Sequence, residues 1–410
     1  MATSALPSIG FSGAGFLGCY HVGVAACLKR QGWLGLDDTA NQPTTIQPKT
    51  IKPLTTLLTG VSAGSMIAAA TAAGVAPEPD GMDVVLTAAR RTRELSKKSR
   101  LPTFDALTPG YSLIDAVEGS FREAIVGALG GTIPSQSQQR QCENDFSSDS
   151  LYDIDPELFQ RRFPKGSLRI GLTDKRVLLS SFPPPSQLSS LPTAYRYVDS
   201  YRNAEDVIAA CMLSSYIPGV TGPLLQDNVS DKLLEALNVG SNWNDSRAGN
   251  DTVKRANRQL HEITRLGMVK NGSGGSEIDP SSNDEEDYST QYWDGGIADV
   301  FPTFDDNTII VSPISGMYSN PAICPEMQQP NGVEDQSPAQ RLLQSYVPTL
   351  PATFRHCSKS NLGLNMQNAR TVKEMILSSD DEQLYQRFRE GYDDTTRFLN
   401  EKGLLTVFSG

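Results

Sequence analysis

Histidine is scarce in this 410-residue chain, which contains only three. Cysteine is sparse as well, and the six cysteines form no Cys-x-x-Cys pair. This spacing argues against a zinc site and, in a chain of this length, against a disulfide framework. We therefore expect free thiols in a reducing, cytoplasmic setting, with no bound metal and no cofactor.

The chain also lacks a long apolar run. No segment approaches the roughly 18 consecutive apolar residues that cross a bilayer, and the N-terminus lacks the basic and apolar regions of a secretory signal. Basic residues are outnumbered by acidic ones, 36 to 47, which gives a formal net charge of -11. This charge argues against nucleic acid as a partner and against electrostatic docking on anionic membranes. We expect any association with membranes or lipid droplets to be peripheral.

The first third of the sequence alternates in the manner of an α/β fold. A strand is expected over residues 6–12, followed by a glycine-rich turn and a helix over 16–31. A second strand over 54–59 leads into another glycine turn and a small-residue helix over 65–73. Two strand–turn–helix units in succession predict a parallel sheet with helices packed on it.

The chain is predicted to contain one large domain and a C-terminal extension. Residues 1–325 form the α/β domain, with a polar, partly disordered insertion at about 228–290. Within the insertion, residues 272–287 carry six acidic and no basic side chains. Residues 326–410 form the extension, in which the spacing over 369–402 is helical. Further elements are expected as strands over 168–172, 177–179 and 308–311 and as a helix over 204–213.

The sharpest motif is Gly60-Val61-Ser62-Ala63-Gly64, which matches the pattern G-x-S-x-G. An apolar strand precedes it and a small-residue helix follows, as a nucleophile elbow requires. Gly60 and Gly64 support the turn, because larger side chains would clash where the strand reverses into the helix. The alternative is an ordinary tight turn in which Ser62 only caps the helix.

A second loop of small residues, Gly13, Ala14 and Gly15, also lies between a predicted strand and a predicted helix. Such a loop exposes several backbone N–H groups in one concave surface, which is a natural binding site for an anion. In an acyl hydrolase these donors would stabilise the oxyanion of the tetrahedral intermediate.

The same loop fits a dinucleotide-binding fingerprint, since Gly13-x-Gly15-x-x-Gly18 has the required spacing. Asp37 and Asp38 even follow about 20 residues later, as that fingerprint demands. The acids should end a second apolar strand, however, and residues 33–36 are too short and too glycine-broken to form one. An oxidoreductase is therefore a remote alternative.

The third motif is Trp293-Asp294-Gly295-Gly296. Gly295 and Gly296 leave little bulk beside the carboxylate, so a turn can present Asp294 to a substrate. Asp294 could then accept the Ser62 proton directly and act as a general base without histidine. The alternative is a surface turn of the Asp-Gly-Gly type.

Only three histidines could complete a catalytic triad with Ser62 and Asp294. His21 lies in the first predicted helix, and His261 lies in the polar insertion, where we expect a solvated face. His356 follows Asp294 and so gives the Ser–Asp–His order of α/β-hydrolases. That fold places several strands before its nucleophile, whereas Ser62 follows only two. A Ser62–Asp294 dyad is therefore favoured over a triad.

Together the three motifs resemble the patatin-like phospholipase domain and, more narrowly, its adipose-triglyceride-lipase branch. The resemblance covers most of residues 8–325 and, more loosely, the C-terminal helices. Its most specific part is SGAGFLGCYHVGVAACL at 12–28. The other similar segments are GVSAGS at 60–65, CMLSSYIPG at 211–219, YWDGGIADVFP at 292–302, VSP at 311–313, ICP at 323–325 and REGYD at 389–393.

The resemblance implies a three-layer α/β/α sandwich of the patatin-like type. It implies that Ser62 is the nucleophile, that Asp294 is the base, and that Gly13, Ala14 and Gly15 supply the oxyanion hole. Ala14 stands where many relatives have glycine, a change that a backbone donor should tolerate. The implied reaction is hydrolysis of a glycerolipid ester, in triacylglycerol or phospholipid, at a lipid–water interface and without a metal.

The sequence is also compatible with two other functions. The chain could be a non-catalytic lipid-binding or partner-recruiting protein of the same fold, or an α/β-hydrolase esterase that uses His356. In the catalytic reading, the acyl chain is expected in an apolar groove between the Ser62 helix and the Ile217-Pro218 segment. The sequence identifies no activator protein.

Overall fold

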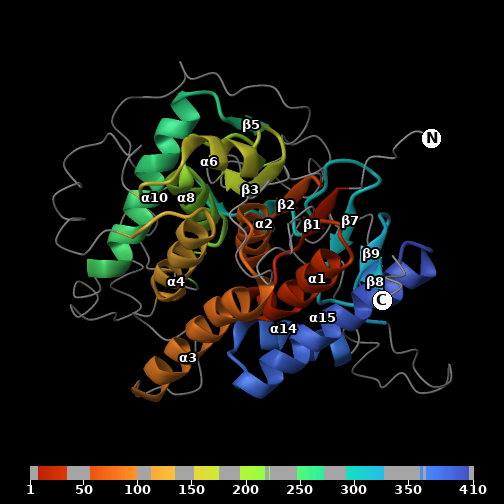
Figure 1. Ribbon diagram of the computed structural model, residues 1–410. Coiled ribbons are helices and arrows are strands. Elements are labelled where there is room, and N and C mark those ends of the chain that lie inside the picture. The colour runs from red at the N-terminus through yellow and green to blue at the C-terminus, as the bar shows by residue number, and fades with distance from the viewer. Residues whose placement is uncertain are drawn as a thin grey trace, which may run out of the picture.

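The computed structural model of the chain describes residues 8–34, 56–98, 112–133, 152–174, 194–217, 221, 247–271, 292–326, 361–362 and 366–405. Eight of the described strands form one mixed sheet at the centre of the molecule (Figure 1). Two short strands, β8 (Gly316–Met317) and β10 (Asn361–Leu362), pair separately. Across the main sheet the order is β5 (Val269–Asn271), β4 (Tyr195–Val198), β3 (Leu168–Asp174), β2 (Leu58–Gly60), β1 (Ile9–Phe11), β7 (Ile309–Val311) and β9 (Ala322–Ile323), with β6 (Tyr292–Asp294) paired to β3.

The centre of the sheet is parallel, and helices connect its strands. β1 pairs in parallel with β2 and β7, and β2 pairs in parallel with β3. Parallel neighbours need crossover connections, which helices usually provide. The predicted sandwich of the α/β class is confirmed, because helices flank a mixed sheet. The helices between β1 and β3 are η1 (Gly15–Leu17), α1 (Gly18–Arg30), α2 (Ala63–Ala73), η3 (Pro77–Gly81), α3 (Met82–Lys98), α4 (Leu113–Ala128) and α6 (Pro156–Arg162).

One apolar core joins the sheet to α1, α2, α4 and α8 (Ala204–Ser214). Ile9, Leu58 and Ile170 project into it from three neighbouring strands, and all three are fully buried. The other face of β1 is covered by extended chain: a Cβ atom on Gly10 would lie 2.1 Å from the carbonyl oxygen of Pro302. Backbone therefore packs directly on backbone at this position, which only glycine permits.

The strand β3 has two partners along one edge. Its first half pairs in parallel with β2, ending with Gly60 opposite Ile170. Its second half pairs antiparallel with β6, which ends with Asp294 opposite Leu172. The carboxyl ends of β2 and β6 therefore meet two residues apart along β3, although they are distant in the sequence.

Side-chain caps begin two of the helices that surround the site. The Ser112 hydroxyl accepts a hydrogen bond from the Asp115 N–H at the start of α4, and the Asn203 side chain accepts one from the Asp206 N–H at the start of α8. These caps satisfy N–H groups that have no partner within the helix. Local sequence thus fixes where each helix begins.

Most expected elements form, but their ends differ. Within the described residues, the strand expected over 54–59 forms over Leu58–Gly60, and the helix expected over 65–73 begins at Ala63. The strand expected over 177–179 lies outside the described residues.

The insertion at about 228–290 is not polar throughout. It contributes α10 (Arg247–Arg265), whose Val253, Ala256, Leu260 and Ile263 are buried against the domain. It also contributes β5, which extends the sheet by pairing antiparallel with β4. An amphipathic helix followed by an edge strand integrates this part of the insertion into the fold. The acidic stretch at 272–287 lies outside the described residues.

In the described part of the C-terminal extension, the residues with the expected helical spacing form two helices, α14 (Met366–Ile376) and α15 (Asp381–Glu401). In Figure 1, α15 (blue) lies along α1 (red). A Cβ atom on Gly23 would lie 1.9 Å from the Phe388 carbonyl oxygen, and one on Gly391 would lie 2.1 Å from the Tyr20 carbonyl oxygen. The two helix backbones are therefore in direct contact, and the extension packs closely on the domain.

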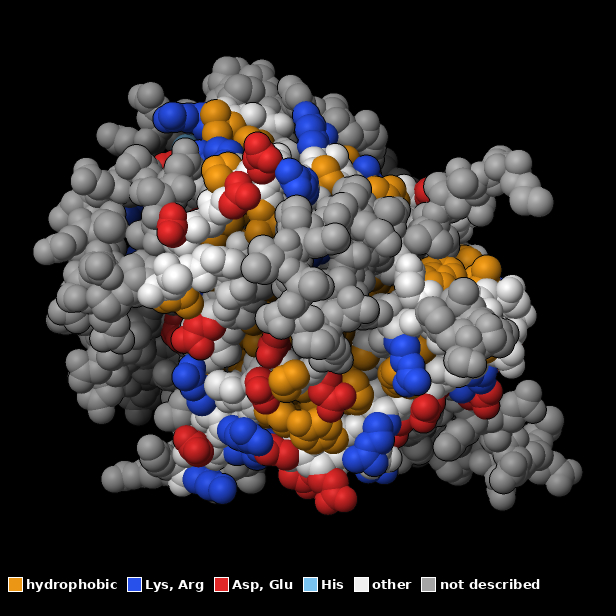
Figure 2. Space-filling model, in the orientation of Figure 1, with side chains coloured by type: hydrophobic (Ala, Val, Ile, Leu, Met, Phe, Trp, Pro, Cys, Tyr) orange, Lys and Arg blue, Asp and Glu red, His pale blue; other side chains and the backbone are white. Residues whose placement is uncertain are grey.

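Figure 2 shows described acidic and basic side chains intermixed on one face, with an apolar patch exposed where α3 and α14 lie. Val372 and Ile376, one turn apart on α14, are among the more exposed large apolar side chains. None of the helices in the described part of the chain is long and apolar enough to cross a membrane.

Candidate active site

The turn between β2 and α2 holds Ser62 in a strained conformation. Ser62 has φ 54° and ψ -136°, so it lies in the positive-φ region of backbone space that non-glycine residues rarely occupy. A Cβ atom on Gly60 would lie 2.4 Å from the Gly64 carbonyl oxygen, and one on Gly64 would lie 2.4 Å from the Phe11 carbonyl oxygen. The turn is therefore as tight as a nucleophile elbow requires, and both flanking glycines are needed for it.

Ser214, the last residue of α8, fixes this turn from the opposite side. The Ser62 N–H donates to the Ser214 carbonyl oxygen at 3.1 Å and lies 3.0 Å from the Ser214 Oγ. The Ser214 hydroxyl in turn donates to the Gly171 carbonyl oxygen at 2.7 Å. Sequence reasoning placed residues 211–219 within the family resemblance but gave Ser214 no role. The sequence feature that could have pointed to Ser214 is the serine pair Ser214-Ser215 at the end of a predicted helix.

Asp294 lies directly beside Ser62. Its carboxyl group accepts a hydrogen bond from the Gly296 N–H at 2.7 Å and lies close enough to the Ser62 side chain for that hydroxyl to lower the pKa of the carboxyl group. Its own N–H donates to the Tyr216 carbonyl oxygen at 2.8 Å, and its carbonyl oxygen accepts from the Thr173 hydroxyl at 2.7 Å. These backbone bonds fix the position of the carboxylate on the end of β6.

Gly295 and Gly296 allow the chain to turn at this point. A Cβ atom on Gly295 would lie 2.2 Å from the Gly171 carbonyl oxygen, so the backbone of α11 (Gly295–Ala298) rests on β3. The tripeptide Asp294-Gly295-Gly296 is thus a buried turn against the sheet, and the alternative of a surface turn is wrong.

Burial raises the pKa of Asp294 to about 7, even though its hydrogen bonds with Ser62 and Gly296 act in the opposite direction. Only 3% of the residue is exposed, and a carboxylate loses its hydration in such a place. A group with a pKa near neutrality can both accept and return a proton at physiological pH. Perturbed carboxyl groups in clefts are also typical of functional sites.

The loop of Gly13, Ala14 and Gly15 lies against the same serine. A Cβ atom on Gly13 would lie 3.6 Å from the Cβ atom of Ser62. The N–H groups of these three residues donate to no backbone carbonyl of the described residues. They are thus free to bind an oxyanion that develops beside Ser62.

The C-terminal helix α14 supports this loop. Gly15 has φ +52°, and a Cβ atom there would lie 2.1 Å from the Met375 carbonyl oxygen. The loop therefore packs directly on the end of α14. Sequence reasoning missed this contact, because the two segments lie at opposite ends of the chain.

An apolar cavity of about 830 Å³, including its open mouth, begins at Ser62. It runs between α2, α3 and α4, and its lining also includes Ser215 and Thr221, which lie on either side of the expected Ile217-Pro218 segment, but not Ile217 itself. Pro218, the other expected wall residue, lies outside the described residues. The lining residues that come from the three helices are Ala63, Met66, Ile67 and Ala70 of α2, Val84, Val85 and Ala88 of α3, and Leu113, Ile114, Val117, Phe121 and Ala124 of α4.

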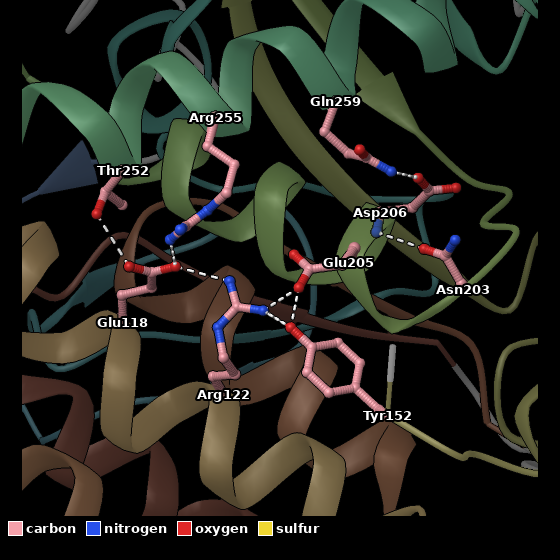
Figure 3. Close-up of polar contacts among 9 residues, drawn as sticks. All are labelled: Glu118, Arg122, Tyr152, Asn203, Glu205, Asp206, Thr252, Arg255 and Gln259. Carbon is pink, nitrogen blue, oxygen red and sulfur yellow. Dashed lines mark hydrogen bonds and ion pairs between the residues drawn. The ribbon is translucent and has the colours of Figure 1, made fainter. Parts of the chain in front are cut away.

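A buried network of charges holds the outer side of α4 (Figure 3). Arg122 forms ion pairs with Glu118, at 2.7 Å, and with Glu205 of α8. Glu118 also pairs with Arg255 of α10 and accepts a hydrogen bond from the Thr252 hydroxyl at 2.9 Å. Buried charges need such partners to remain ionised. The network therefore fastens the cavity wall α4 to both α8 and α10.

Neither described histidine lines the cavity. His21 is fully buried in the core, where its ring packs edge-on against Phe11 with centroids 5.5 Å apart. Burial lowers the pKa of His21 to about 3, so the ring is neutral. His261 lies on α10, and His356 lies outside the described residues.

Comparison with known proteins adds to this geometry. The family model described as patatin-like phospholipase matches residues 10–306. Patatin-like phospholipase domain-containing protein 2 of Mus musculus is 21% identical over 406 residues, which cover 97% of this chain and 51% of that protein. Its Rattus norvegicus counterpart is 21% identical and covers 97% and 52%. The chain thus spans about half the length of these curated relatives.

Among solved structures, the chain is similar to the ExoU–SpcU complex from the type III secretion system of Pseudomonas aeruginosa. The identity is 14%, the TM-score is 0.25, and the match covers 97% of this chain and 60% of that chain.

Proposed function

The chain belongs to the patatin-like phospholipase family, and on this basis we propose that it is a lipid acyl hydrolase that cleaves glycerolipid esters through an acyl-serine on a Ser62–Asp294 dyad. The observation that carries the proposal is the position of the strained Ser62 beside the buried Asp294 carboxyl group and in the lining of an apolar cavity. This arrangement would supply a nucleophile, a base and a binding site for an acyl chain in one place.

The first half of the reaction forms the acyl-enzyme. The Ser62 Oγ attacks the ester carbonyl carbon while Asp294 takes the hydroxyl proton. The negative charge on the carbonyl oxygen is stabilised by backbone N–H groups of Gly13, Ala14 and Gly15. The tetrahedral intermediate then collapses, the bond to the alcohol breaks, and the leaving alcohol takes the proton from Asp294.

The second half releases the fatty acid. Water attacks the acyl-serine carbonyl and gives its proton to Asp294, and the same N–H groups stabilise the second oxyanion. Collapse returns that proton to the Ser62 Oγ and frees the acid. No other titratable group is needed, because the Asp294 carboxyl, with its pKa of about 7, can accept and return the proton in both halves.

Two observations support a lipid as the substrate. The cavity wall is built from apolar side chains of three helices, which suits a hydrocarbon chain and does not suit a polar acyl group. The narrower resemblance to the adipose-triglyceride-lipase branch puts triacylglycerol first among the candidate lipids, with phospholipid second. Contact with a lipid surface would then be peripheral and would bring the cavity mouth to its substrate.

The test is fatty acid release from emulsified triacylglycerol and from phospholipid vesicles by the wild type and by Ser62→Ala. We expect the substitution to lower the rate by at least about 10³-fold, because a dyad loses its function when either member is removed. Labelling of Ser62 by a fluorophosphonate would establish its nucleophilicity independently of the lipid. Ester hydrolysis retained in Ser62→Ala would contradict the proposal, and fatty acid binding without turnover would favour the non-catalytic reading.

A further inference from the structure

The end of the cavity far from Ser62 is built from small residues on two helices. Ala70 of α2 and Ala124 of α4 both line the cavity and are only partly buried. Val75, 4% exposed, lines the cavity next to Ala70, whose carbonyl oxygen accepts its N–H. The Ser62 end of the cavity, by contrast, also carries the polar residue Ser215.

The direction of α4 follows from its contacts at the mouth. The Ile114 N–H donates to the Thr221 carbonyl oxygen at 3.0 Å, and the Thr221 hydroxyl donates to the Ser215 carbonyl oxygen at 2.6 Å. Ser215 follows Ser214, which binds the Ser62 backbone. The first turn of α4 therefore lies at the Ser62 end, and Ala124 lies nearly three turns further along the cavity.

Helix geometry gives the length of the cavity. Ser62 and Ala70 are separated by about 12 Å along α2, and Ile114 and Ala124 by about 15 Å along α4, at 1.5 Å per residue. An extended chain advances about 1.2 Å per bond, as the backbone dimensions imply. The cavity thus accommodates roughly ten to twelve carbon–carbon bonds of an acyl chain.

We propose that Ala70 and Ala124 limit the length of acyl chain that the cavity buries, so that the preference among fatty acid esters rises with chain length up to about twelve carbons and then levels off. This inference rests on the proposed function of Ser62. The two alanines bound the space because their methyl groups are the last cavity-lining side chains on their helices. A larger side chain at either position would occupy the place of the terminal methylenes.

Helix α4, which forms one wall of the cavity, cannot easily move outward to make room for such a side chain. Glu118 and Arg122 lie on the side of α4 that faces α8 and α10, where they form the network of Figure 3. Moving α4 outward would separate Arg122 from Glu205, and breaking this buried ion pair is costly. It would also separate Glu118 from Arg255, whose side chain is half exposed. Added bulk inside the cavity is therefore expected to shorten it.

The experiment measures kcat/KM for p-nitrophenyl esters with acyl chains of 4, 8, 12 and 16 carbons in one detergent. For the wild type we expect kcat/KM to rise by up to about fourfold per methylene that becomes buried and to level off near twelve carbons. In Ala70→Leu and Ala124→Leu we expect the rise to end nearer eight carbons, with the ratio of the twelve-carbon to the eight-carbon ester lowered by roughly tenfold or more.

Ala128→Leu is the matched control, because Ala128 lies one turn beyond Ala124 on α4 and does not line the cavity. Its chain-length profile should equal that of the wild type. Thermal melting and fluorophosphonate titration of Ser62 confirm that each variant is folded and count its active sites.

The outcomes separate the two proposals. A Ser62-dependent profile that is flat, or that Ala70→Leu and Ala124→Leu leave unmoved, overturns the length limit while the hydrolase function stands. An equal loss of activity on every chain length also overturns it. Hydrolysis that survives in Ser62→Ala instead overturns the proposed function on which the inference rests.

Discussion

At the scale of single residues, the site depends on conformations and protonation states that cost stability. Ser62 has a positive φ, a strain of about 1–3 kcal/mol that the surrounding structure must offset. Asp294 is buried without a cationic partner among the described residues, and its pKa is about 7. Both features favour reactivity over stability, which is the usual pattern at catalytic sites.

The pH dependence of activity follows from the Asp294 pKa. The base must be ionised to accept a proton, so kcat/KM should rise with pH, reach half its maximum near pH 7 and fall about tenfold per unit below that. Initial rates on a soluble ester between pH 5 and 9 measure this profile. A midpoint near pH 4, the ordinary value of an aspartate, would show that burial does not govern the base.

Asp294→Asn should separate stability from activity. The folded-state pKa of Asp294 is raised above its unfolded value, so the stability linked to its protonation is present below about pH 4 and is lost as pH rises through 7. The variant cannot ionise and should be inactive, yet more stable than the wild type at pH 8 by on the order of 3 kcal/mol. Urea denaturation at pH 8 and pH 5 checks this, and the advantage should shrink at pH 5. A variant that is equally destabilised at both values contradicts it.

Ser214 is expected to act as a positioning residue for the elbow. Ser214→Ala removes the hydroxyl that lies 3.0 Å from the Ser62 nitrogen and that donates to Gly171. We expect kcat to fall about tenfold with little change in KM, since a small displacement of the nucleophile affects chemistry more than binding. Ser120→Ala, which loses only a bond to a carbonyl oxygen within α4, is the control. A raised KM with unchanged kcat would refute this role.

At the scale of elements, glycines show where helices touch through their backbones. Gly391 of α15 has no space for a Cβ atom against Tyr20, whereas Gly119, exposed on α4, has nothing within 4 Å of that position. The same residue type therefore has opposite significance in two helices. One glycine is required by packing, and the other only increases the conformational entropy of the unfolded chain.

Gly391→Ala and Gly119→Ala should therefore shift stability in opposite directions. The first should destabilise the fold by about 1–3 kcal/mol or more, because the backbone of α1 must move. The second should stabilise it by about 0.5–1 kcal/mol, the usual gain of alanine over glycine within a helix. Thermal and urea denaturation measure both. Equal effects of the two substitutions would mean that α15 does not lie against α1 in solution.

At the scale of the whole molecule, the topology creates the site. β2 and β6 pair along the same edge of β3, which brings residues 62 and 294 together. The Gly13 loop follows β1, the neighbour of β2, so its N–H groups reach the same place. The C-terminal helices complete the arrangement, with α14 against Gly15 and α15 against α1.

The sequence by itself predicted the α/β class and brought Ser62, Asp294 and the Gly13 loop into one hypothesis. It could do so because a tight turn, a buried parallel strand and a close backbone approach each impose local requirements on residue type. The alternation of apolar strands with small-residue helices is likewise a local pattern. These features can be recognised without knowing which segments are neighbours.

Other features of the site were determined only by the tertiary structure. The cavity between α2, α3 and α4, the raised pKa of Asp294 and the role of Ser214 all depend on which distant segments pack together. The sequence did not reveal that α3 and α4 form walls of the cavity, and it interpreted the insertion as polar. The segments that bury α10 and contact α4 are far away in the chain. Burial and its electrostatic effects are properties of the assembled fold, since they require removal of water by many segments at once.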